Sequence, residues 1–248
     1  MRFTIEIPVP GEVCYRAPMK YKNKKRHLDI LAIDTGGTRV KIRVDHRDEV
    51  RQAPTGPAMT PRGLVDRVRA LAGDWSFDAV SLGYPGEVRN GRPSQEPHNL
   101  GTGWIGFDFQ SAFGRPVKVI NDAAMQALGS YQGGRMLFLG LGTGLGSAMV
   151  IDKLVQPMEL SKLPYKNGET FGDFVRHSAI ERLGLEVWQQ EVCRVIELLR
   201  DALVADYVVV GGGNARLLKA LPPHARPGDN ANAFEGGFRL WLDPDVRI

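Results

Sequence analysis

Cysteine is scarce in this chain of 248 residues. The only two, Cys14 and Cys193, are far apart in sequence, and no closely spaced set of histidine and cysteine accompanies them. A disulfide scaffold needs more cysteines, and structural zinc sites space their ligands closely. We therefore expect neither a disulfide framework nor structural zinc, and a reducing cytoplasm is the default location.

Long apolar runs are missing as well. No stretch approaches the ~20 apolar residues of a membrane span, and the first residues lack the apolar core of a signal peptide. With 43% hydrophobic and 24% charged residues, the composition is that of an ordinary globular protein. The length suits two small lobes or one large domain, and we expect no membrane partner.

Positive charge is concentrated in one segment of the sequence. The net charge is +4, and the one dense basic run ends an N-terminal extension, residues 1–27: Lys20, Lys22, Lys24, Lys25, Arg26 and His27. Such a run can bind a polyanion, polyphosphate or nucleic acid, but a solvated basic loop is the commoner explanation. An extension this short and rich in proline leaves no room for a helix-turn-helix, so nucleic acid is not an expected partner.

Glycine, in contrast, is abundant, with 29 residues, and three glycine-rich turns each follow an apolar run. In the first, residues 31–41, a predicted strand ends at Asp34 and a turn follows that contains Gly36, Gly37, Thr38 and Lys41. Glycine amides can approach an anion closely, and an aspartate at a strand end can hold magnesium through its waters. Alone, this pattern is more often only a hairpin.

The second turn, within residues 136–152, joins two predicted strands through Gly140, Gly142, Thr143, Gly144 and Gly146. A tight hairpin and a phosphate cradle explain it about equally well, and the threonine hydroxyl slightly favours phosphate. The third, within residues 207–221, runs from a buried strand through three glycines, Gly211 to Gly213, into a helix expected to begin near Asn214. Helix starts attract anions, although small residues are also common where a strand meets a helix.

Between the first two turns, residues 117–131 predict a strand that ends at Asn121 and Asp122, followed by a helix. Either side chain could simply cap that helix. With phosphate turns on both sides in sequence, however, a carboxylate at a strand end is a candidate general base for phosphoryl transfer. The pattern therefore points to Asp122 as the catalytic residue.

Taken in order, the motifs resemble the ROK family of sugar kinases from about residue 28 onward. They are DTGGTRVK, SLGYPGEV, NLGTGW, VINDA, LGTGLGSA, MELSK and VVVGGG. Within that family, GLGSA, PGEVRNGR and the compact length are most similar to the polyphosphate glucokinases. The resemblance implies an α/β protein of the actin-like ATPase (RNase H-like) fold, with two lobes around a cleft, and a homodimer.

The resemblance also implies roles for individual residues. Asp34 would position Mg²⁺, and Gly212 and Gly213 would border the nucleoside of ATP, if ATP rather than polyphosphate is the donor. The expected phosphate contacts are Gly36, Gly37, Thr38, Lys41, Gly142, Thr143 and Gly144. The expected sugar contacts are Asn99, Asn121, Asp122, Glu159 and Lys162, and Asp122 doubles as the base.

The sequence departs from the family pattern at two expected sugar contacts. Lys162 stands where the family places a histidine, and a second family glutamate falls on Gly172, for which Glu169 or Asp173 could substitute. Lys162 could pair with an anionic acceptor or lie in solvent. Glucose as the acceptor is therefore in doubt.

The expected organisation has four parts: the extension 1–27, an N-terminal lobe 28–118, a C-terminal lobe 119–231, and a closing helix in 232–248 that packs back on the first lobe. Residues 170–205 are expected to be helical. The predicted activity is phosphoryl transfer from ATP or polyphosphate to a hexose hydroxyl. A non-catalytic sugar or nucleotide sensor of the same fold, or an ATPase that acts on a protein partner, remains open.

Overall fold

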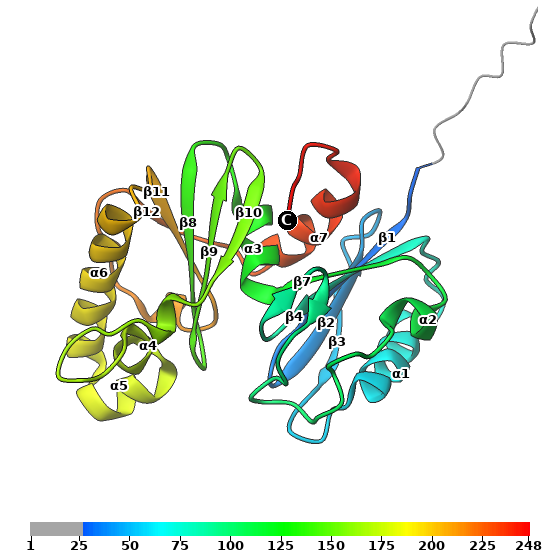
Figure 1. The fold of residues 1–248 in the computed structure, drawn as a ribbon, viewed down its shortest axis with the longest axis horizontal. Helices are drawn as coiled ribbons and strands as arrows, with labels where there is room; N and C mark the ends of the chain where they lie inside the picture. The colour runs from blue at the N-terminus through cyan, green and yellow to red at the C-terminus, as the bar shows by residue number, and fades with distance from the viewer. Residues whose placement is uncertain (1–26) are drawn as a thin grey trace, which may run out of the picture.

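The computed structural model describes residues 27–248. Cys14 and the basic residues from Lys20 to Arg26 lie outside the described residues. Two five-stranded sheets form separate lobes, and two helices, α3 (Asp122–Ser130) and α7 (Asn232–Leu242), lie between them (Figure 1). None of the helices in residues 27–248 combines the length and apolar character needed to cross a lipid bilayer.

The first sheet has the strand order β3-β2-β1-β4-β7. Its strands are β1 (Ile30–Thr35), β2 (Arg39–Val44), β3 (Arg51–Pro54), β4 (Ala79–Tyr84) and β7 (Val117–Asn121). β1 is antiparallel to β2 and parallel to β4, and β4 is parallel to β7. Parallel strands end at the same edge of a sheet, so Asp34 and Asn121 both come to the edge that faces the second lobe.

The two faces of β1 bury alternate residues, as the period of a strand requires. Leu31 and Ile33 pack in the core with α1 (Pro61–Ala72) and α2 (Phe109–Phe113), whereas Ile30 and Ala32 pack against α7. The short hairpin of β5 (Val88–Arg89) and β6 (Arg92–Pro93) extends from the end of β4. Helices therefore cover both faces of this sheet, which explains why its central strands are apolar throughout.

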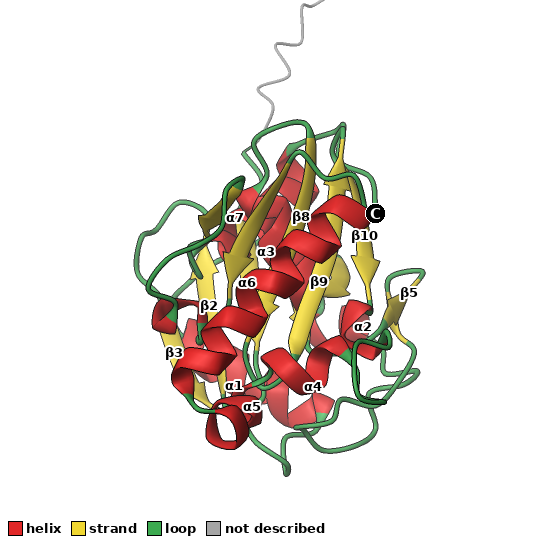
Figure 2. Ribbon diagram, turned by 90° about the vertical axis from the view of Figure 1, so that its left-hand side faces the viewer, coloured by secondary structure: helices red, strands yellow, loops and turns green. Residues whose placement is uncertain are grey.

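The second sheet has the order β10-β9-β8-β11-β12. Its strands are β8 (Arg135–Leu141), β9 (Leu145–Ile151), β10 (Leu154–Met158), β11 (Tyr207–Gly211) and β12 (Ala225–Pro227). Leu137 and Leu139 pack in a core with α6 (Leu185–Ala202), and Met136 and Phe138 pack with α3. Figure 2 shows α6 lying across this sheet.

α3 and α7 cross at two glycines. A Cβ on Gly129 would lie 1.8 Å from the carbonyl oxygen of Asn232, and one on Gly236 would lie 1.8 Å from that of Met125. α7 also contacts β1 and β4, and Ser81 on β4 donates a 2.6 Å hydrogen bond to the carbonyl of Gly237. The two crossing helices therefore connect the sheets through close backbone contact.

Residues 170–205, which the sequence predicts to be helical, form three helices: α4 (Phe171–Val175), α5 (His177–Leu183) and α6. They are separated by Arg176 in an extended conformation and by Gly184, whose φ is +80°. Residue 118, after which the first lobe was expected to end, lies within β7, and this strand pairs with β4 of the first sheet.

The helix expected near Asn214 is only the 3-10 helix η2 (Ala215–Leu217). Two prolines at 222 and 223 follow closely, and the chain turns back to form β12. Proline cannot continue a helix and restricts the residue before it, so no room is left for a longer one.

Candidate active site

A cleft of about 490 Å³ lies between the lobes, where β1, β7 and β8 end. Every site residue predicted from the sequence lines it: Asp34, Gly36, Gly37, Thr38, Lys41, Asn99, Asn121, Asp122, Gly142, Thr143, Gly144, Glu159, Lys162, Gly212 and Gly213. Folding therefore brings all three glycine-rich turns and the Asn-Asp pair to one place.

The side chains of Asn121 and Asp122 make different hydrogen bonds and can therefore serve different roles. Asn121 caps α3, because its Oδ1 accepts a 3.0 Å hydrogen bond from the amide of Ala124, and its Nδ2 donates to the carbonyl of Gly86 at 3.1 Å. Asp122 accepts a 2.8 Å bond at Oδ1 from the amide of Ala123, the next residue along the chain. Capping is thus done by the neighbour, and Asp122 can present its carboxylate to the cleft.

Burial at the base of the cleft raises the pKa of Asp122 to about 7, and the nearby carboxylate of Asp34 adds to this effect, as does Glu159 more weakly. Burial likewise raises the pKa of Asp34, opposed by Lys41, whose Nζ lies 3.9 Å from Oδ2. A carboxyl group with a pKa near neutrality can take up and release a proton at physiological pH.

The two carboxylates also fit a divalent cation. The carboxylate of Asp34 helps to raise the pKa of Asp122, and at Asp34 the ammonium of Lys41 opposes the effect of burial. Hard ions such as Mg²⁺ take oxygen ligands, keep several waters and are usually held by one or two carboxylates together with substrate phosphates. The carboxylate of Asp34 would therefore suit a magnesium ion, which would supply positive charge in the cleft.

The β8–β9 turn is fixed from outside by backbone contacts. The carbonyl of Gly142 accepts hydrogen bonds from the amide of His177 at 2.9 Å and from Nδ2 of Asn214 at 3.2 Å. Within the turn, the amide of Gly142 donates to the carbonyl of Gly144 at 3.0 Å. The turn is thus presented to the cleft in one defined conformation.

The glycines of this turn differ in what they require. A Cβ on Gly146 would lie 2.8 Å from Cβ of Ala123, so packing needs glycine there. Neither Gly142 nor Gly144 has a positive φ, and a Cβ on either would meet nothing within 4 Å. The hairpin by itself therefore does not need these two glycines, which favours the phosphate interpretation of the turn over the purely structural one.

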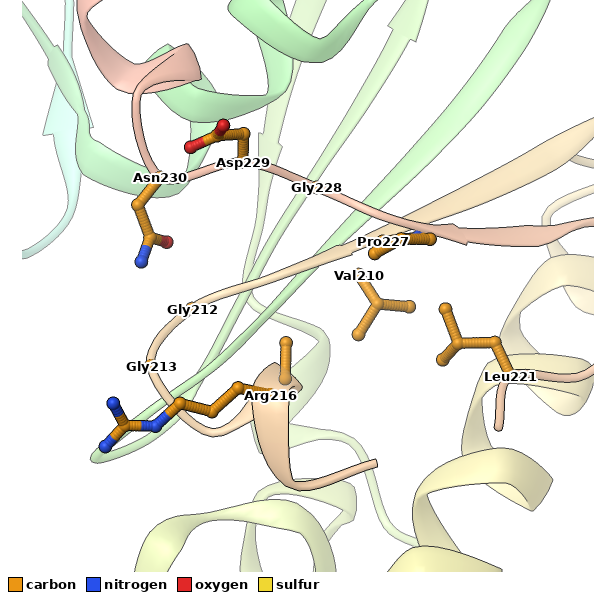
Figure 3. Close-up of a pocket in the computed structure, with 10 residues that line it drawn as sticks. Val210, Gly212, Gly213, Arg216, Leu221, Pro227, Gly228, Asp229 and Asn230 are labelled. Atoms are coloured by element: carbon orange, nitrogen blue, oxygen red, sulfur yellow. The ribbon is translucent and has the colours of Figure 1, made fainter. Parts of the chain in front are cut away.

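A side pocket of about 390 Å³ adjoins the cleft at the third turn (Figure 3). It shares Gly212, Gly213 and Asn230 with the cleft. Its remaining walls are apolar on one side and polar at the rim: Val210, Ala215, Leu221, Pro227, Arg216 and Asp229. Apolar walls with a few polar groups at one edge are typical of a small-ligand site.

At the opposite end of the cleft, Lys162 pairs with Glu159. Its Nζ lies 3.4 Å from Oε2 of Glu159, and both side chains remain about half exposed, at 57% and 46%. Lys162 therefore lines the cleft instead of pointing away from it. Two of the predicted sugar contacts, Lys162 and Glu159, are therefore ion-paired with each other.

Packing explains Gly172, the second position where the sequence departs from the family pattern. A Cβ on Gly172 would lie 2.9 Å from the carbonyl oxygen of Ser161, so no side chain fits at this position. The two residues suggested as substitutes have partners elsewhere: Asp173 belongs to the capping box of α4, and Glu169 pairs with Arg182 at 3.3 Å. Neither lines the cleft.

Several cleft residues were not assigned from the sequence, among them Glu87, Glu96, His98, Ser161 and Asn230. Glu87 lies in the quoted motif SLGYPGEV, so its charge beside a proline-glycine turn was a usable signal. Glu87 and Arg89 also border a smaller compartment of about 290 Å³ that opens beside Asn121 and Glu159. Asn230 follows a proline-glycine loop and offers no local pattern.

Comparison with known proteins decides the family. The model of the ROK family matches residues 30–157. The chain belongs to the ROK family. A polyphosphate glucokinase from Mycobacterium leprae is 25% identical over 209 residues, which are 75% of this chain and 64% of that protein. A Mycobacterium tuberculosis polyphosphate glucokinase is 25% identical over 75% of this chain and 73% of its own length. The resemblance predicted from the motifs is thus confirmed.

Solved structures agree on the fold. An inorganic polyphosphate/ATP-glucomannokinase from Arthrobacter sp. strain KM superposes with a TM-score of 0.72 at 23% identity, covering 85% of this chain and 96% of that one. A ROK family glucokinase from Streptomyces griseus, in complex with glucose and AMPPNP, gives a TM-score of 0.64 at 18% identity over 84% and 97%. The predicted actin-like ATPase fold is therefore confirmed.

Proposed function

We propose that this ROK protein is a sugar kinase that transfers a phosphoryl group from ATP or polyphosphate to a hexose hydroxyl. The observation that carries the proposal is Asp122, a buried carboxyl with a pKa of about 7 that lies in the cleft with both glycine-rich turns. A protein that only binds a sugar has no need of a base tuned to neutral pH, so this position favours a kinase over a sensor.

In the proposed mechanism, Asp122 accepts the proton of the acceptor hydroxyl. The hydroxyl oxygen forms a bond to the terminal phosphorus of the donor, and the bond from that phosphorus to its bridging oxygen breaks. ADP, or a polyphosphate shortened by one unit, leaves with the bond electrons. Open glycines at 142 and 144 let backbone amides approach the transferred group.

Asp34 would hold magnesium when the donor is bound, and the ion would supply positive charge to the phosphate oxygens. Lys41, 3.9 Å from Asp34, keeps that carboxylate paired before the ion arrives. The relatives support both donors, because the Arthrobacter protein is described as a polyphosphate/ATP enzyme. The side pocket beside Gly212 has room for a nucleoside, which supports ATP.

The acceptor end is the least like the family pattern. Lys162 neutralises part of the charge of Glu159, and Gly172 contributes no side chain. Asn99, Asn121 and Asp122 remain to bind hydroxyl groups, with Glu87 on the neighbouring compartment. We therefore propose a hexose acceptor without naming glucose as the preferred one.

A panel of hexoses and amino sugars, each assayed with ATP and with polyphosphate, tests the proposal. The expected result is sugar-dependent turnover with at least one pair. Donor hydrolysis that no sugar stimulates would favour an ATPase, and sugar binding without turnover would favour a sensor. The homodimer and the cytoplasmic location stay predictions, which sizing by light scattering and cell fractionation can check.

A further inference from the structure

Two histidines and two aspartates meet at the open end of the β1–β2 hairpin. His27 and Asp29 precede β1, and Asp45 and His46 follow β2. This end of the sheet lies opposite the strand ends that form the cleft, and none of the four residues lines the cleft. Nothing in the proposed kinase reaction uses them.

The donor atoms of the four side chains lie close together. Asp29 Oδ1 is 3.5 Å from Nδ1 of His27 and 3.5 Å from Nδ1 of His46. Asp45 lies 3.7 Å from Nε2 of His27 through Oδ2 and 3.3 Å from Nδ1 of His46 through Oδ1. One ligand atom from each of His27, Asp29 and Asp45 can be chosen so that all lie within 4.8 Å of one another.

These separations suit a small tetrahedral ion. With metal–nitrogen and metal–oxygen bonds of about 2.0–2.1 Å, ligand atoms at the corners of a tetrahedron lie roughly 3.4 Å apart. Imidazole nitrogens combined with carboxylate oxygens are ligands of zinc and its neighbours in the first transition row, whereas calcium and magnesium prefer oxygen alone. The chemistry of the set therefore differs from that of the magnesium site proposed in the cleft.

Hydrogen bonds hold the carboxylate of Asp45 and the main chain of Asp29 in place. The amide of Ile30 donates to Asp45 Oδ1 at 3.1 Å, and the amide of Asp45 donates to the carbonyl of Ile30 at 3.1 Å. The amide of Asp29 donates to Oδ2 of Asp78 at 3.3 Å, and its carbonyl accepts from the amide of Asp78 at 2.7 Å. Ligands that are fixed before binding lose little conformational entropy when an ion arrives.

Charge also favours a cation here. The Asp45 side chain is only 6% exposed and that of Asp29 is 36% exposed, and Asp78 brings a third carboxylate to the same hairpin end. With neutral imidazoles, a divalent ion would balance Asp29 and Asp45. His27 and His46 are 66% and 39% exposed, so an ion has a path from solvent and the imidazoles can turn toward it.

We propose that His27, Asp29, Asp45 and His46 form a binding site for a divalent transition metal of the zinc class. One nitrogen of His27 and one oxygen from each aspartate bind the ion as they lie. His46, whose Nδ1 is 3.5 Å from Asp29 and 3.3 Å from Asp45, rotates its half-exposed ring to bring a nitrogen to the ion as the fourth ligand. The bound ion joins the start of β1 to the end of β2 and stabilises the first lobe without entering the catalytic cleft.

Cobalt(II) is the probe for the test, because its visible absorption reports four-coordinate binding directly. The full chain is used without an affinity tag, with Cys14→Ser to remove a thiol outside the described residues, and is stripped with a chelator that is then dialysed away. The variants are His27→Ala and His46→Ala. The matched controls are His98→Ala, an exposed cleft histidine, and Asp122→Asn, which removes a cleft carboxylate.

The parent protein and both controls should bind one equivalent of cobalt with the absorption of a four-coordinate site, and zinc should displace it. His27→Ala and His46→Ala should each weaken binding about tenfold or more. Zinc should raise the melting temperature of the parent, and less so that of the two histidine variants. The proposal is overturned if no saturable binding occurs, or if binding survives both histidine changes; its loss in Asp122→Asn would place the ion in the cleft instead.

Discussion

At the scale of the residue, the raised pKa of Asp122 suits a proposed base, but ionising this buried carboxyl lowers the stability of the folded protein. Its folded pKa of about 7 lies above its ordinary value of 3.8, mainly because of burial. The folded state therefore binds more protons than the unfolded state between these two values. Ionising the carboxyl in the folded protein is unfavourable, as expected of a group placed for catalysis and not for folding.

This difference predicts how stability depends on pH. The part of the free energy of unfolding that comes from Asp122 should be present below about pH 4 and fall as pH rises toward 7. In Asp122→Asn that fall should be absent, so the variant should be the more stable protein near pH 8. Urea unfolding of both proteins at several pH values measures this. Parallel stability profiles would show that Asp122 is not perturbed.

Lys162 gives the second prediction at this scale. Its ammonium lies 3.4 Å from Glu159, so it competes with a sugar hydroxyl for that carboxylate. Lys162→His should raise kcat/KM for neutral glucose relative to anionic sugars by about 0.5–1.5 kcal/mol, or roughly two- to tenfold. Lys166→His, which changes a lysine outside the cleft, is the control. An unchanged ratio across the sugar panel would remove Lys162 from acceptor recognition.

At the scale of the element, the β8–β9 turn separates two kinds of glycine. Gly144→Ala should leave the melting temperature almost unchanged, because a Cβ there meets nothing within 4 Å, but should raise the KM for the donor more than that for the sugar. Gly146→Ala is the matched comparison: its Cβ would lie 2.8 Å from Ala123, so it should lose about 1–3 kcal/mol of stability.

Steady-state kinetics with each substrate varied in turn, together with thermal melts, distinguish these outcomes. If Gly144→Ala lowered stability and affected both substrates equally, the turn would be a structural hairpin and not a phosphate cradle.

The elements also show what the sequence could predict and why. The glycine-rich turns and the Asn121–Asp122 pair were found because their chemistry is local: a strand end, small residues and a cap lie within a few positions of one another. The sequence could not show that position 172 must be glycine, because the constraint comes from the carbonyl oxygen of Ser161 in the 3-10 helix Leu160–Lys162. The sequence predicts a helix after Gly213, but the structure has only a 3-10 helix there. Glycines indicate where a helix begins, whereas the prolines at 222 and 223 limit how far it can extend.

At the scale of the whole molecule, the α3–α7 crossing connects the lobes. Gly236→Ala places a Cβ 1.8 Å from the carbonyl of Met125, so the two helices must move apart. We expect the free energy of unfolding to fall by about 1–3 kcal/mol or more, whereas Gly144→Ala serves as a glycine-to-alanine control without a steric clash. Denaturant unfolding of the two variants measures the difference. Equal stability would mean that the crossing adapts without cost.

The two-lobed arrangement was predictable from the order of the motifs, but the limits of the lobes were not. β7 joins the first sheet although it immediately precedes Asp122, the proposed base, because parallel pairing with β4 is a long-range contact. The metal site proposed at residues 27–46 escaped prediction for the same reason. Its residues come from two segments that are separated in sequence and come together only after β1 and β2 pair.

The central claim is that the cleft between the lobes transfers a phosphoryl group with Asp122 as the base. The most direct test is kcat of Asp122→Asn on the best sugar and donor of the panel, measured beside a thermal melt of the same sample. We expect a fall of about 10²- to 10⁴-fold in kcat, with the protein folded and at least as stable as the parent near pH 8. Near-normal turnover by the folded variant would contradict it.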